Sequence, residues 1–298
     1  MQMNSGSGRS MTIEERNSTM NAHSIEAGSL RFAFGKNWNR FLESVTDGRI
    51  VEAERSLREM LSITTLEGKT FLDIGSGSGL FSLAARKLGA RVHSFDYDPH
   101  SVACTAELKR RYFTNDGNWT IEQGSVLDEE YVRALGQFDI VYSWGVLHHT
   151  GAMWQALANA SAPVSPGGRL FIAIYNDQGW RSVYWKKIKR LYNRLPPMGR
   201  YPLVCLRFGA VWGAITLRDS FSGDPFHSWK NYAQKSRGMS PWRDEVDWVG
   251  GYPFEVAKPE EIFHFYRERG FTLANLRTCG GKLGNNEFVF QKMAFDPA

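Results

Sequence analysis

Three glycines and one aspartate are spaced in a way that suits the binding of a nucleoside. Gly75, Gly77 and Gly79 follow directly on a short apolar run, and Asp96 stands twenty-one residues after the first of them. Glycine lacks a Cβ atom, so ligand atoms can approach the backbone closely where the next helix begins. A carboxylate at the end of a second strand can accept hydrogen bonds from both hydroxyls of a ribose. The pattern predicts a site for an adenosine-containing cofactor, and a tight turn without a ligand is the alternative.

The same segment departs from the fingerprint of dinucleotide-binding proteins. That fingerprint reads G-x-G-x-x-G, whereas the third glycine here, Gly79, is followed by Leu80. An acid, Asp73, also stands two residues before the glycines, where it can orient the positively charged amino group of an amino-acid moiety. The alternatives are an NAD-dependent oxidoreductase and a nucleoside-binding module without catalytic activity. The intact glycines and the second-strand acid argue against a degenerate site.

Alternating strands and helices must position these residues. Short apolar runs predict strands over residues 70–74, 91–96, 119–123, 138–143 and 169–175, with helical stretches between them. Alternation of this kind predicts a parallel sheet with helices on both faces. From Pro259 to about Arg269 we expect a helix, and residues 271–279 and 287–291 are then expected to form an antiparallel hairpin.

The chain divides into five segments on these grounds. Residues 1–28 are rich in Ser, Asn and Gly and poor in large apolar residues, which predicts a disordered tail. Residues 29–68 are expected to form two amphipathic helices split at an Asp-Gly pair, and residues 69–175 form the cofactor-binding core. Residues 176–257 do not fit the alternation, so we expect a largely helical cap insertion that decides the substrate. Residues 258–298 supply the C-terminal helix and the hairpin that completes the core sheet.

Motifs in the core resemble those of the class I S-adenosylmethionine-dependent methyltransferases. The first motif of that family looks like residues 71–79, Phe-Leu-Asp-Ile-Gly-Ser-Gly-Ser-Gly, and its fourth strand with the following loop looks like residues 137–149. The likeness covers residues 69–175 and the terminal hairpin, and it is closest to the small-molecule branch that includes the quinone-biosynthesis O-methyltransferases. The resemblance implies an α/β fold, a Rossmann-like, doubly wound, seven-stranded sheet with an antiparallel last strand, and S-adenosyl-L-methionine as the cofactor.

The resemblance also implies which residues hold the cofactor. The family often has an Asp after the third strand that meets the adenine amino group, whereas this chain has Ser125 after Gly124. We therefore expect the Ser125 hydroxyl or the Val126 backbone to meet the adenine, with Tyr97 as a stacking wall. The full set of expected cofactor-binding residues is Asp73, Gly75, Ser76, Gly77, Gly79, Asp96, Tyr97, Ser125, Val126 and Trp144.

A base is needed only if the methyl acceptor carries a proton that must leave. Methyl transfer is an in-line displacement, so the protein chiefly has to hold the acceptor atom about 3 Å from the methyl group. His148 and His149 follow the fourth predicted strand, where either imidazole can accept a proton near neutral pH. Asp177 and Glu287 are further candidates. The alternatives are packing against the core, hydrogen bonding to the backbone, helix capping and exposure to solvent.

Positive charge is concentrated in the cap. The whole chain carries a formal net charge of +5, and residues 181–207 contain eight basic residues and no acidic one. A basic helix here is expected to have one apolar face, formed by Tyr184, Ile188, Leu191, Tyr192 and Leu195, and an opposite face formed by Lys186, Lys187, Arg190 and Arg194. This pattern is typical of a surface helix that can touch anionic lipid, and ordinary packing is the alternative.

Aromatic residues are also frequent in the cap. They are irregularly spaced in a segment that contains glycine and proline, so they either line an apolar substrate pocket or pack the cap. The residues concerned are Trp229, Tyr232, Trp242, Trp248, Tyr252 and Phe254.

Composition excludes several classes of protein. The chain has 298 residues, 42% hydrophobic and 22% charged, which is an ordinary globular balance. Arg207 interrupts the longest apolar run, residues 203–217, so no run reaches the roughly 18 residues that a membrane span needs. The N-terminus lacks the apolar core of a secretory signal, which favours a cytoplasmic protein. The three cysteines are far apart and form no C-x-x-C pair, so neither disulfides nor a metal site are expected.

These observations favour an S-adenosylmethionine-dependent methyltransferase that acts on a small-molecule metabolite. Methylation of oxygen is the default, with nitrogen and sulfur as open alternatives. A second hypothesis is methylation of RNA or a membrane lipid docked through residues 181–207. A nucleic acid is not the expected partner, because no Asn-Pro-Pro-Tyr-like tetrad follows the fourth strand. A small-molecule methyl acceptor is the expected partner, and peripheral membrane contact and a homodimer are left open.

Overall fold

In the described part of the chain, seven strands form one sheet. The computed structural model describes residues 32, 45–235 and 241–294, so the expected disordered tail and the first of the two N-terminal helices lie outside the described residues. The strand order is β3-β2-β1-β4-β5-β7-β6. The strands are β1 (Thr70–Ile74), β2 (Arg91–Asp96), β3 (Trp119–Gln123), β4 (Phe138–Trp144), β5 (Val164–Tyr175), β6 (Phe271–Arg277) and β7 (Asn285–Lys292).

Strands β1 to β5 are parallel, and β7 runs antiparallel to both of its neighbours, β5 and β6. The predicted seven-stranded sheet with an antiparallel last strand is therefore confirmed. Strand β5 begins earlier than expected, because Val164 already pairs with Phe138. The register then shifts before Arg169 pairs with Ile140, so the Pro-Gly-Gly turn is an irregularity within the strand.

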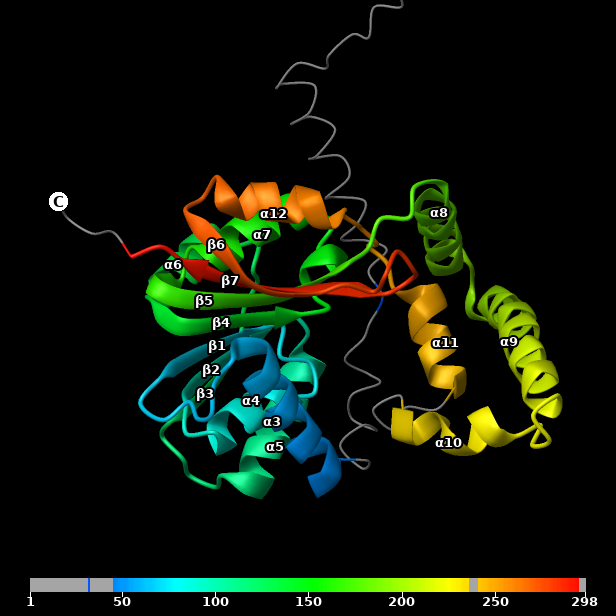
Figure 1. Cartoon of the computed structure of the whole chain (residues 1–298), viewed down its shortest axis with the longest axis horizontal. Coiled ribbons are helices and arrows are strands. Elements are labelled where there is room, and N and C mark those ends of the chain that lie inside the picture. The colour runs from blue at the N-terminus through cyan, green and yellow to red at the C-terminus, as the bar shows by residue number, and fades with distance from the viewer. Residues whose placement is uncertain (1–31, 33–44, 236–240, 295–298) are drawn as a thin grey trace, which may run out of the picture.

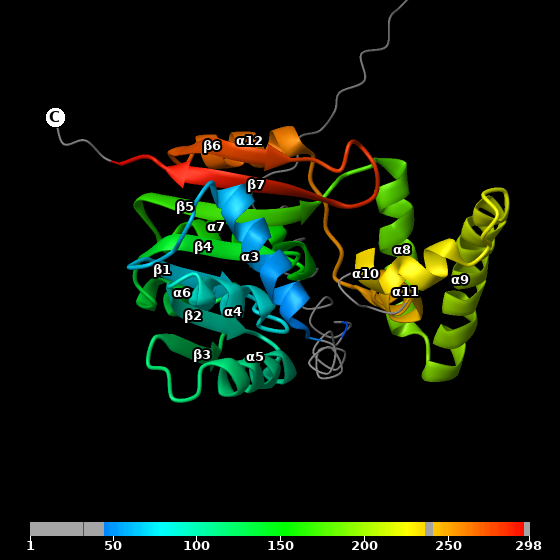
Figure 2. The ribbon, with the colours of Figure 1, turned by 60° about the horizontal axis from the view of Figure 1, so that its bottom comes forward.

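Helices cover both faces of the sheet (Figures 1 and 2). On one face lie α3 (Asp47–Leu61), α4 (Leu80–Lys87) and α5 (Pro99–Tyr112), and on the other lie α6 (Glu129–Ala134), α7 (Met153–Ser161) and α12 (Pro259–Arg267). Alternation along β1 explains the two cores, since Phe71 packs with the first group and Leu72 with the second. Each such fully buried side chain contributes about 1.5–3 kcal/mol.

The strand order places the glycine-rich turn beside the end of β4. Strand β1 has β2 on one side and β4 on the other, so the direction of winding reverses there. Ligands of open α/β sheets bind in the crevice at the carboxyl ends of the strands next to this reversal. The residues after β1, β2 and β4 therefore meet at one edge of the sheet.

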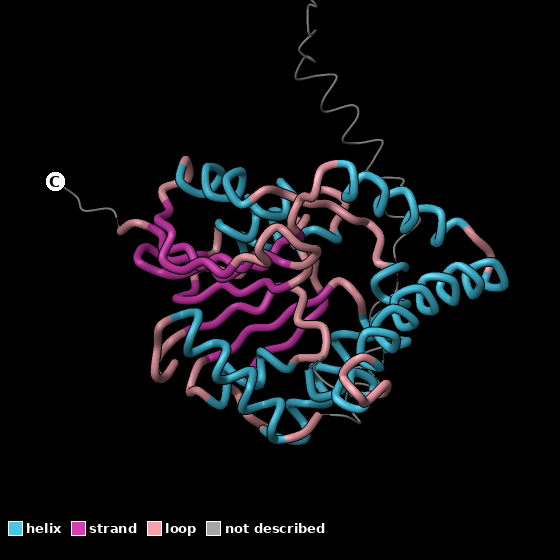
Figure 3. Tube along the Cα trace, turned by 45° about the vertical axis from the view of Figure 1, so that its right-hand side comes forward, coloured by secondary structure: helices cyan, strands magenta, loops and turns pink. Residues whose placement is uncertain are grey.

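The cap consists of helices that lie beyond the carboxyl ends of β4 and β5 (Figures 1 and 3). They are α8 (Trp180–Arg194), α9 (Pro197–Ser220), α10 (His227–Lys235) and α11 (Pro241–Gly250). Among the described residues, no helix combines the length and the apolar composition needed to cross a lipid bilayer.

The prediction for the faces of helix α8 was partly wrong. The predicted apolar face is divided, because Tyr184 and Leu191 are exposed whereas Tyr192 is buried. Lys189 and Ser182 are instead buried on the inner side. The reason is the surface that α8 packs against, because the Lys189 side chain lies over the rings of Trp248 and Phe254. Helical periodicity in the sequence does not report which face a distant segment covers.

Candidate functional site

The glycine-rich turn joins β1 to α4 in a conformation that suits glycine. Gly75, Gly77 and Gly79 have φ values of 76°, 57° and 79°, a region that other residues adopt at a cost of roughly 1–2 kcal/mol. A Cβ atom on Gly75 would lie 2.5 Å from a methyl group of Val146, and one on Gly79 would lie 2.8 Å from the Cα atom of Thr105. The backbone of the turn therefore packs directly against the loop after β4 and against α5.

Asp96 ties the end of β2 to this turn. One carboxylate oxygen accepts a hydrogen bond from the Gly77 N–H at 2.9 Å, and the other accepts from the Asp98 N–H at 2.8 Å. The Ser76 hydroxyl lies 3.0 Å from the hydroxyl of Thr105, which joins the turn to α5. A carboxylate has about four acceptor positions, so these two contacts are compatible with additional bonds to ribose hydroxyls.

The expected adenine-binding residues lie after β2 and β3. Tyr97 is exposed next to Asp96, as a stacking wall would have to be. The Ser125 hydroxyl accepts a hydrogen bond from the Leu127 N–H at 3.2 Å, while the Val126 carbonyl accepts one from Asn159 Nδ2 at 2.8 Å. Both groups have intramolecular partners, and their contact with adenine stays a prediction.

Tyr131 is a neighbour of this region that the sequence analysis missed. A Cβ atom on Gly124 would collide with its ring, and its hydroxyl donates a hydrogen bond to Glu122 at 2.6 Å. The ring thus lies directly against the backbone after β3 and shapes the edge where adenine is expected. The signal in the sequence was the glycine at the strand end, which marks a close approach.

Asp73 lies beneath the glycine-rich turn rather than on its surface. Its side chain is buried and accepts a hydrogen bond from the hydroxyl of Ser82. Ser82 is 2.7 Å from the Ser94 hydroxyl, which also accepts a bond from the indole N–H of Trp119 at 2.9 Å. Burial, with a further contribution from Asp96, raises the pKa of Asp73 to about 7. Its expected role in orienting an amino group stays a prediction.

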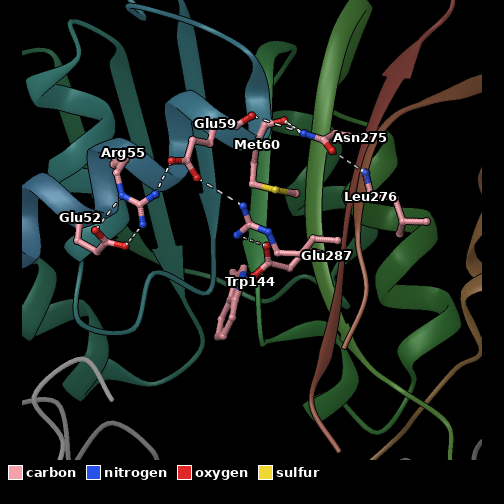
Figure 4. Close-up of polar contacts among 9 residues, drawn as sticks. Glu52, Arg55, Glu59, Met60, Trp144, Asn275, Leu276 and Glu287 are labelled. Atoms are coloured by element: carbon pink, nitrogen blue, oxygen red, sulfur yellow. Dashed lines mark hydrogen bonds and ion pairs between the residues drawn. The ribbon is translucent and has the colours of Figure 1, made fainter. Parts of the chain in front are cut away.

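Glu287 and Trp144 belong to a polar network that joins α3 to the terminal strands (Figure 4). Glu287 Oε1 accepts a hydrogen bond from Trp144 Nε1 at 2.9 Å, and Oε2 lies 3.4 Å from Arg277. Arg277 also lies 3.5 Å from Glu59, which pairs with Arg55 on the surface of α3. Because both carboxylate oxygens have partners here, the geometry favours a structural role for Glu287 over proton removal.

Asp177 closes the turn that leads from β5 into the cap. Its carboxylate accepts a hydrogen bond from the Gly179 N–H at 2.8 Å, and its own N–H donates to the Ala257 carbonyl at 3.1 Å. Helix α8 starts at the next residue, Trp180. This arrangement favours a turn-forming role for the carboxylate.

His148 lies in a buried cluster at the end of β4. Its side chain is fully buried and its Nε2 atom has no hydrogen-bond partner. The ring centroid lies 3.9 Å from that of Tyr175. Burial is the main reason why the pKa of His148 lies well below its ordinary value, and His149 and Lys189 lower it further. His148 is therefore a neutral imidazole near pH 7.

The other ring nitrogen of His148, Nδ1, can accept a hydrogen bond from the Tyr175 backbone N–H at 3.4 Å. A hydrogen bond between the His148 ring and the Ala173 backbone raises the pKa of the ring. The neighbouring His149 has a firmer partner, since its Nδ1 atom lies 2.6 Å from the Pro253 carbonyl oxygen. The two histidines thus differ, and only His148 has an unpartnered ring nitrogen among them.

Lys189 is the most unusual residue that the sequence analysis missed. It comes from cap helix α8, is fully buried, and donates a hydrogen bond to the Trp248 carbonyl. Its Nζ atom lies 4.3 Å from the ring centroid of Trp248 and 4.9 Å from that of Phe254. Burial, with a further contribution from Arg207, lowers the pKa of Lys189 to about 7, although Asp247 acts in the opposite direction. Lysine is rarely buried in this way without an anionic partner.

A signal for Lys189 was present in the sequence. Ser182 lies seven residues before Lys189, Trp185 lies four residues before it, and Tyr192 lies three residues after it. This is the spacing of residues on one helical face. Ser182 and Tyr192 are buried with it. Counting Lys189 only as one member of the basic cluster 181–207 concealed this pattern.

The aromatic residues of the cap fall into two groups. Trp229, Tyr232 and Trp242 pack against Phe208 or Trp212 of helix α9, so they stabilise the cap itself. Trp248 and Phe254 instead pack against Tyr175, with centroid distances of 5.8 and 5.3 Å, and enclose Lys189. Tyr252 is buried. Both groups thus pack against other aromatic rings, and the lining of a substrate pocket by Trp248 and Phe254 stays a prediction.

Glu255 anchors the loop that carries His148. Its side chain accepts a hydrogen bond from the Met153 N–H at 3.0 Å, and its own N–H donates to the His148 carbonyl at 3.0 Å. Burial raises the pKa of Glu255 to about 7. Within the described ranges, no group of three or more His, Cys, Asp or Glu residues is arranged to hold a metal ion.

Comparison with known proteins gives methyltransferases named for different acceptors. A family model for a methyltransferase domain matches residues 72–170. The chain is 30% identical over 182 residues to the ubiquinone biosynthesis O-methyltransferase of Coxiella burnetii. This match covers 59% of this chain and 75% of that protein. It is also 30% identical over 119 residues to the protein of the same name from Methylobacterium sp. (strain 4-46). That match covers 40% of this chain and 46% of the Methylobacterium protein. The chain thus spans about half the length of this second relative.

A solved structure has a similar fold. It is the magnesium protoporphyrin IX methyltransferase from Synechocystis PCC 6803 with bound SAH, with a TM-score of 0.53 and 12% sequence identity. The match covers 90% of this chain and 99% of that chain. At this level of identity the likeness concerns the fold alone.

Proposed function

We propose that this chain, which belongs to the class I S-adenosylmethionine-dependent methyltransferases, methylates an oxygen atom of a small-molecule acceptor. The acceptor would bind where the cap meets the carboxyl ends of β4 and β5. The observation that carries this proposal is the buried cluster of His148, Tyr175 and Lys189 under the rings of Trp248 and Phe254. Two polar atoms in this cluster, His148 Nε2 and Trp248 Nε1, are buried without a hydrogen-bond partner. Such atoms are what a bound substrate would satisfy.

The residues at the other end fit the cofactor. Gly75, Gly77 and Gly79 present backbone without side chains, and Asp96 and Tyr97 stand where ribose and adenine contacts are expected. When bound, S-adenosylmethionine supplies a methyl group activated by its sulfonium sulfur. The chain holds this end close to the acceptor end, because Gly75 packs against Val146, which is two residues before His148.

His148 is suited to remove the proton of an acceptor hydroxyl. In the tautomer that carries its hydrogen on Nδ1, Nε2 keeps the lone pair that accepts the proton. The lowered pKa of His148 keeps that lone pair available at neutral pH. The tilted contact between the rings of His148 and Tyr175 holds the imidazole in place. A positioned base of this kind contributes roughly 10²- to 10⁴-fold to the rate.

The aromatic walls favour a flat acceptor. Trp248 and Phe254 pack edge-on or tilted against Tyr175, and Lys189 lies against two of these rings. The Lys189 amine can donate a hydrogen bond to an acceptor oxygen in either of its protonation states near pH 7. The set combines apolar surface with a few polar groups, as small-molecule sites usually do.

The test is a labelling experiment with two matched variants. Purified protein is incubated with methyl-labelled S-adenosylmethionine and a metabolite extract, and labelled products are sought by mass spectrometry. We expect a labelled product of low molecular mass from the wild-type protein. His148→Asn should lower turnover at least about 100-fold and leave cofactor affinity unchanged, because general-base catalysis is lost while the glycine-rich turn is intact. His149→Asn is the control and should retain most of the turnover.

Other outcomes would contradict parts of this proposal. Label found only in RNA, protein or lipid fractions would favour a macromolecular or lipid acceptor docked through the basic residues of the cap. Equal losses in His148→Asn and His149→Asn would remove the assignment of the base. A cytoplasmic location stays a prediction from the sequence.

A further inference from the structure

One side of helix α9 is exposed and largely apolar as far as Leu217. The helix has 24 residues, and residues 208–217 contain no charged side chain. Met198 in the first turn is 90% exposed, Leu206 near the middle is 74% exposed, and Phe221 just after the last residue is 86% exposed. The exposed positions of this side, called here the outer face of α9, are Met198, Tyr201, Pro202, Leu206, Ala210, Gly213, Ala214, Leu217 and Phe221. A continuous apolar surface of this kind marks a binding surface.

The opposite side of α9 already has partners within the cap. Val204 packs in a small core with Tyr192 and Val249, and Trp212 packs against Trp229 of helix α10. Helix α9 is also the cap helix farthest from the sheet (Figure 1). The outer face therefore points away from the rest of the described chain.

The charge along α8 and along α9 as far as Arg218 is entirely positive. Residues 178–218 contain no acidic side chain. Helix α8, which precedes α9, carries the exposed basic residues Arg181, Lys186, Lys187 and Arg194. A negatively charged partner surface complements this region, whereas two copies of the chain packed face to face would bring like charges together.

Arg207 leaves the outer face uninterrupted. In the sequence it is the charge that breaks the apolar run of α9. In the fold its guanidinium turns inward, where it pairs with Glu245 and lies 4.7 Å from the ring centroid of Trp185. An internal ion pair thus removes the charge from the exposed side.

An open apolar groove runs along the same helix. It has a volume of about 480 Å³ and lies between α9 and Trp229 of α10. Gly209 and Gly213 lie one turn apart in its wall, and no atom comes within 4 Å of the position where a Cβ atom on either would stand.

We propose that the outer face of α9, with the basic residues of α8, docks this protein on an anionic phospholipid surface. The helix lies in the interface plane, with its apolar side among the upper acyl chains and the arginines and lysines of α8 at the phosphate groups. Each basic side chain near such a surface adds to the attraction, and added salt screens it. This mode of binding needs no membrane-spanning helix, in agreement with the described part of the chain.

Vesicle flotation with the full chain tests this proposal. The probes are phosphatidylcholine vesicles with roughly one third phosphatidylglycerol, and vesicles of phosphatidylcholine alone. We expect flotation with the anionic vesicles, little with the neutral ones, and a decrease at high salt. The double variant Leu206→Glu/Phe221→Glu should lower the partition coefficient at least about tenfold, because two carboxylates replace apolar contacts. Val51→Glu, at an exposed apolar position of helix α3 on the sheet rather than on the cap, is the control and should float like the wild type.

Cofactor binding and the circular dichroism spectrum must be unchanged in the double variant, which separates loss of docking from loss of fold. A failure of the wild type to float, equal flotation with neutral vesicles, or an equal loss in Val51→Glu would overturn the proposal. So would a wild-type dimer, measured by light scattering, that becomes a monomer in the double variant without any vesicle binding. That last result would assign the outer face to a second copy of the chain.

Discussion

The two ends of the candidate active site are built in different ways. The cofactor end comes from one short stretch, the glycine-rich turn, together with the end of the adjacent strand β2, and its contacts are mostly made by backbone atoms. The acceptor end brings together His148, Tyr175, Lys189 and Trp248 from four separate elements. Its characteristic groups are buried, titratable side chains and aromatic rings.

The difference teaches where specificity can change. A cofactor end that depends on backbone shape tolerates few substitutions, since a single Cβ atom on Gly75 meets Val146. An acceptor end assembled by the cap can change its substrate through side chains of α8 and α11 without altering the turn. Variants at the two ends should therefore fail in different measurements.

The largest effect is expected at the acceptor end, in the pH dependence of stability. Burial lowers the pKa of Lys189 from the ordinary value of 10.5 to about 7. Between these pH values the unfolded chain holds a proton that the folded protein lacks, so the folded state becomes more stable as pH rises. The effect is about 1.4 kcal/mol for each pH unit. Relative to Lys189→Met, the wild-type free energy of unfolding should rise by about 4 kcal/mol from about pH 7 to about pH 10.

Urea unfolding at several pH values measures this difference. Lys187→Met, at an exposed position of the same helix, is the matched control and should give a curve parallel to that of the wild type. If the Lys189→Met curve is also parallel, the acceptor end does not bury its lysine, and the contrast between the two ends is lost.

The next effect is expected at the cofactor end, from a single methyl group. Gly75→Ala places a Cβ atom against Val146. Gly145 also has a positive φ, but no atom lies within 4 Å of the position of a Cβ atom there, so Gly145→Ala is the matched control. In both variants the free energy of unfolding should fall by roughly 1–2 kcal/mol because of left-handed backbone strain. In Gly75→Ala it should fall by a further amount of roughly 1–3 kcal/mol because of overpacking. Calorimetry should also show weaker cofactor binding in Gly75→Ala. Adding Val146→Ala should restore part of both losses, and equal losses in the two glycine variants would contradict close packing here.

A smaller effect is expected from the carboxylate at the end of β2. Asp96→Ala removes the acceptor expected for ribose and the bond to the Gly77 N–H. Hydrogen bonds to charged groups contribute about 1.5–3 kcal/mol, so affinity for S-adenosylmethionine should fall roughly 10- to 150-fold. Asp98→Ala is the control, because that side chain accepts from the His100 N–H and caps helix α5. Calorimetric titration showing unchanged affinity in Asp96→Ala would sink the ribose assignment.

Much of the core could be predicted because its signals are local. Strands β1, β2 and β3 begin and end at the predicted residues, and the hairpin of β6 and β7 surrounds the predicted glycine-rich turn. The family and the cofactor are confirmed by the methyltransferase relatives. Short apolar runs, glycine turns and a Pro at the start of a helix act within a few residues, so they can be recognised without a partner.

The acceptor end could be predicted only in part. His148 was named because it follows a strand whose end lies at the ligand-binding edge, whereas Lys189 was counted only among the basic residues of 181–207. Glu287 was considered as a base, yet its carboxylate is joined to Trp144 and Arg277. In each case the decisive neighbour lies far away in the chain, and helical or strand periodicity carries no information about it.

The sequence alone determined the sheet, the order of its elements and the glycine-rich turn with its acid, because these depend on local backbone preference and on alternation of apolar residues. Only the tertiary structure decided the state of the charges in the cap. Lys189 is enclosed by aromatic rings, and Arg207 turns inward to Glu245 while the outer face of α9 stays apolar. Burial is a property of the packed assembly, and the same basic side chain is solvated or desolvated according to the surface that covers it.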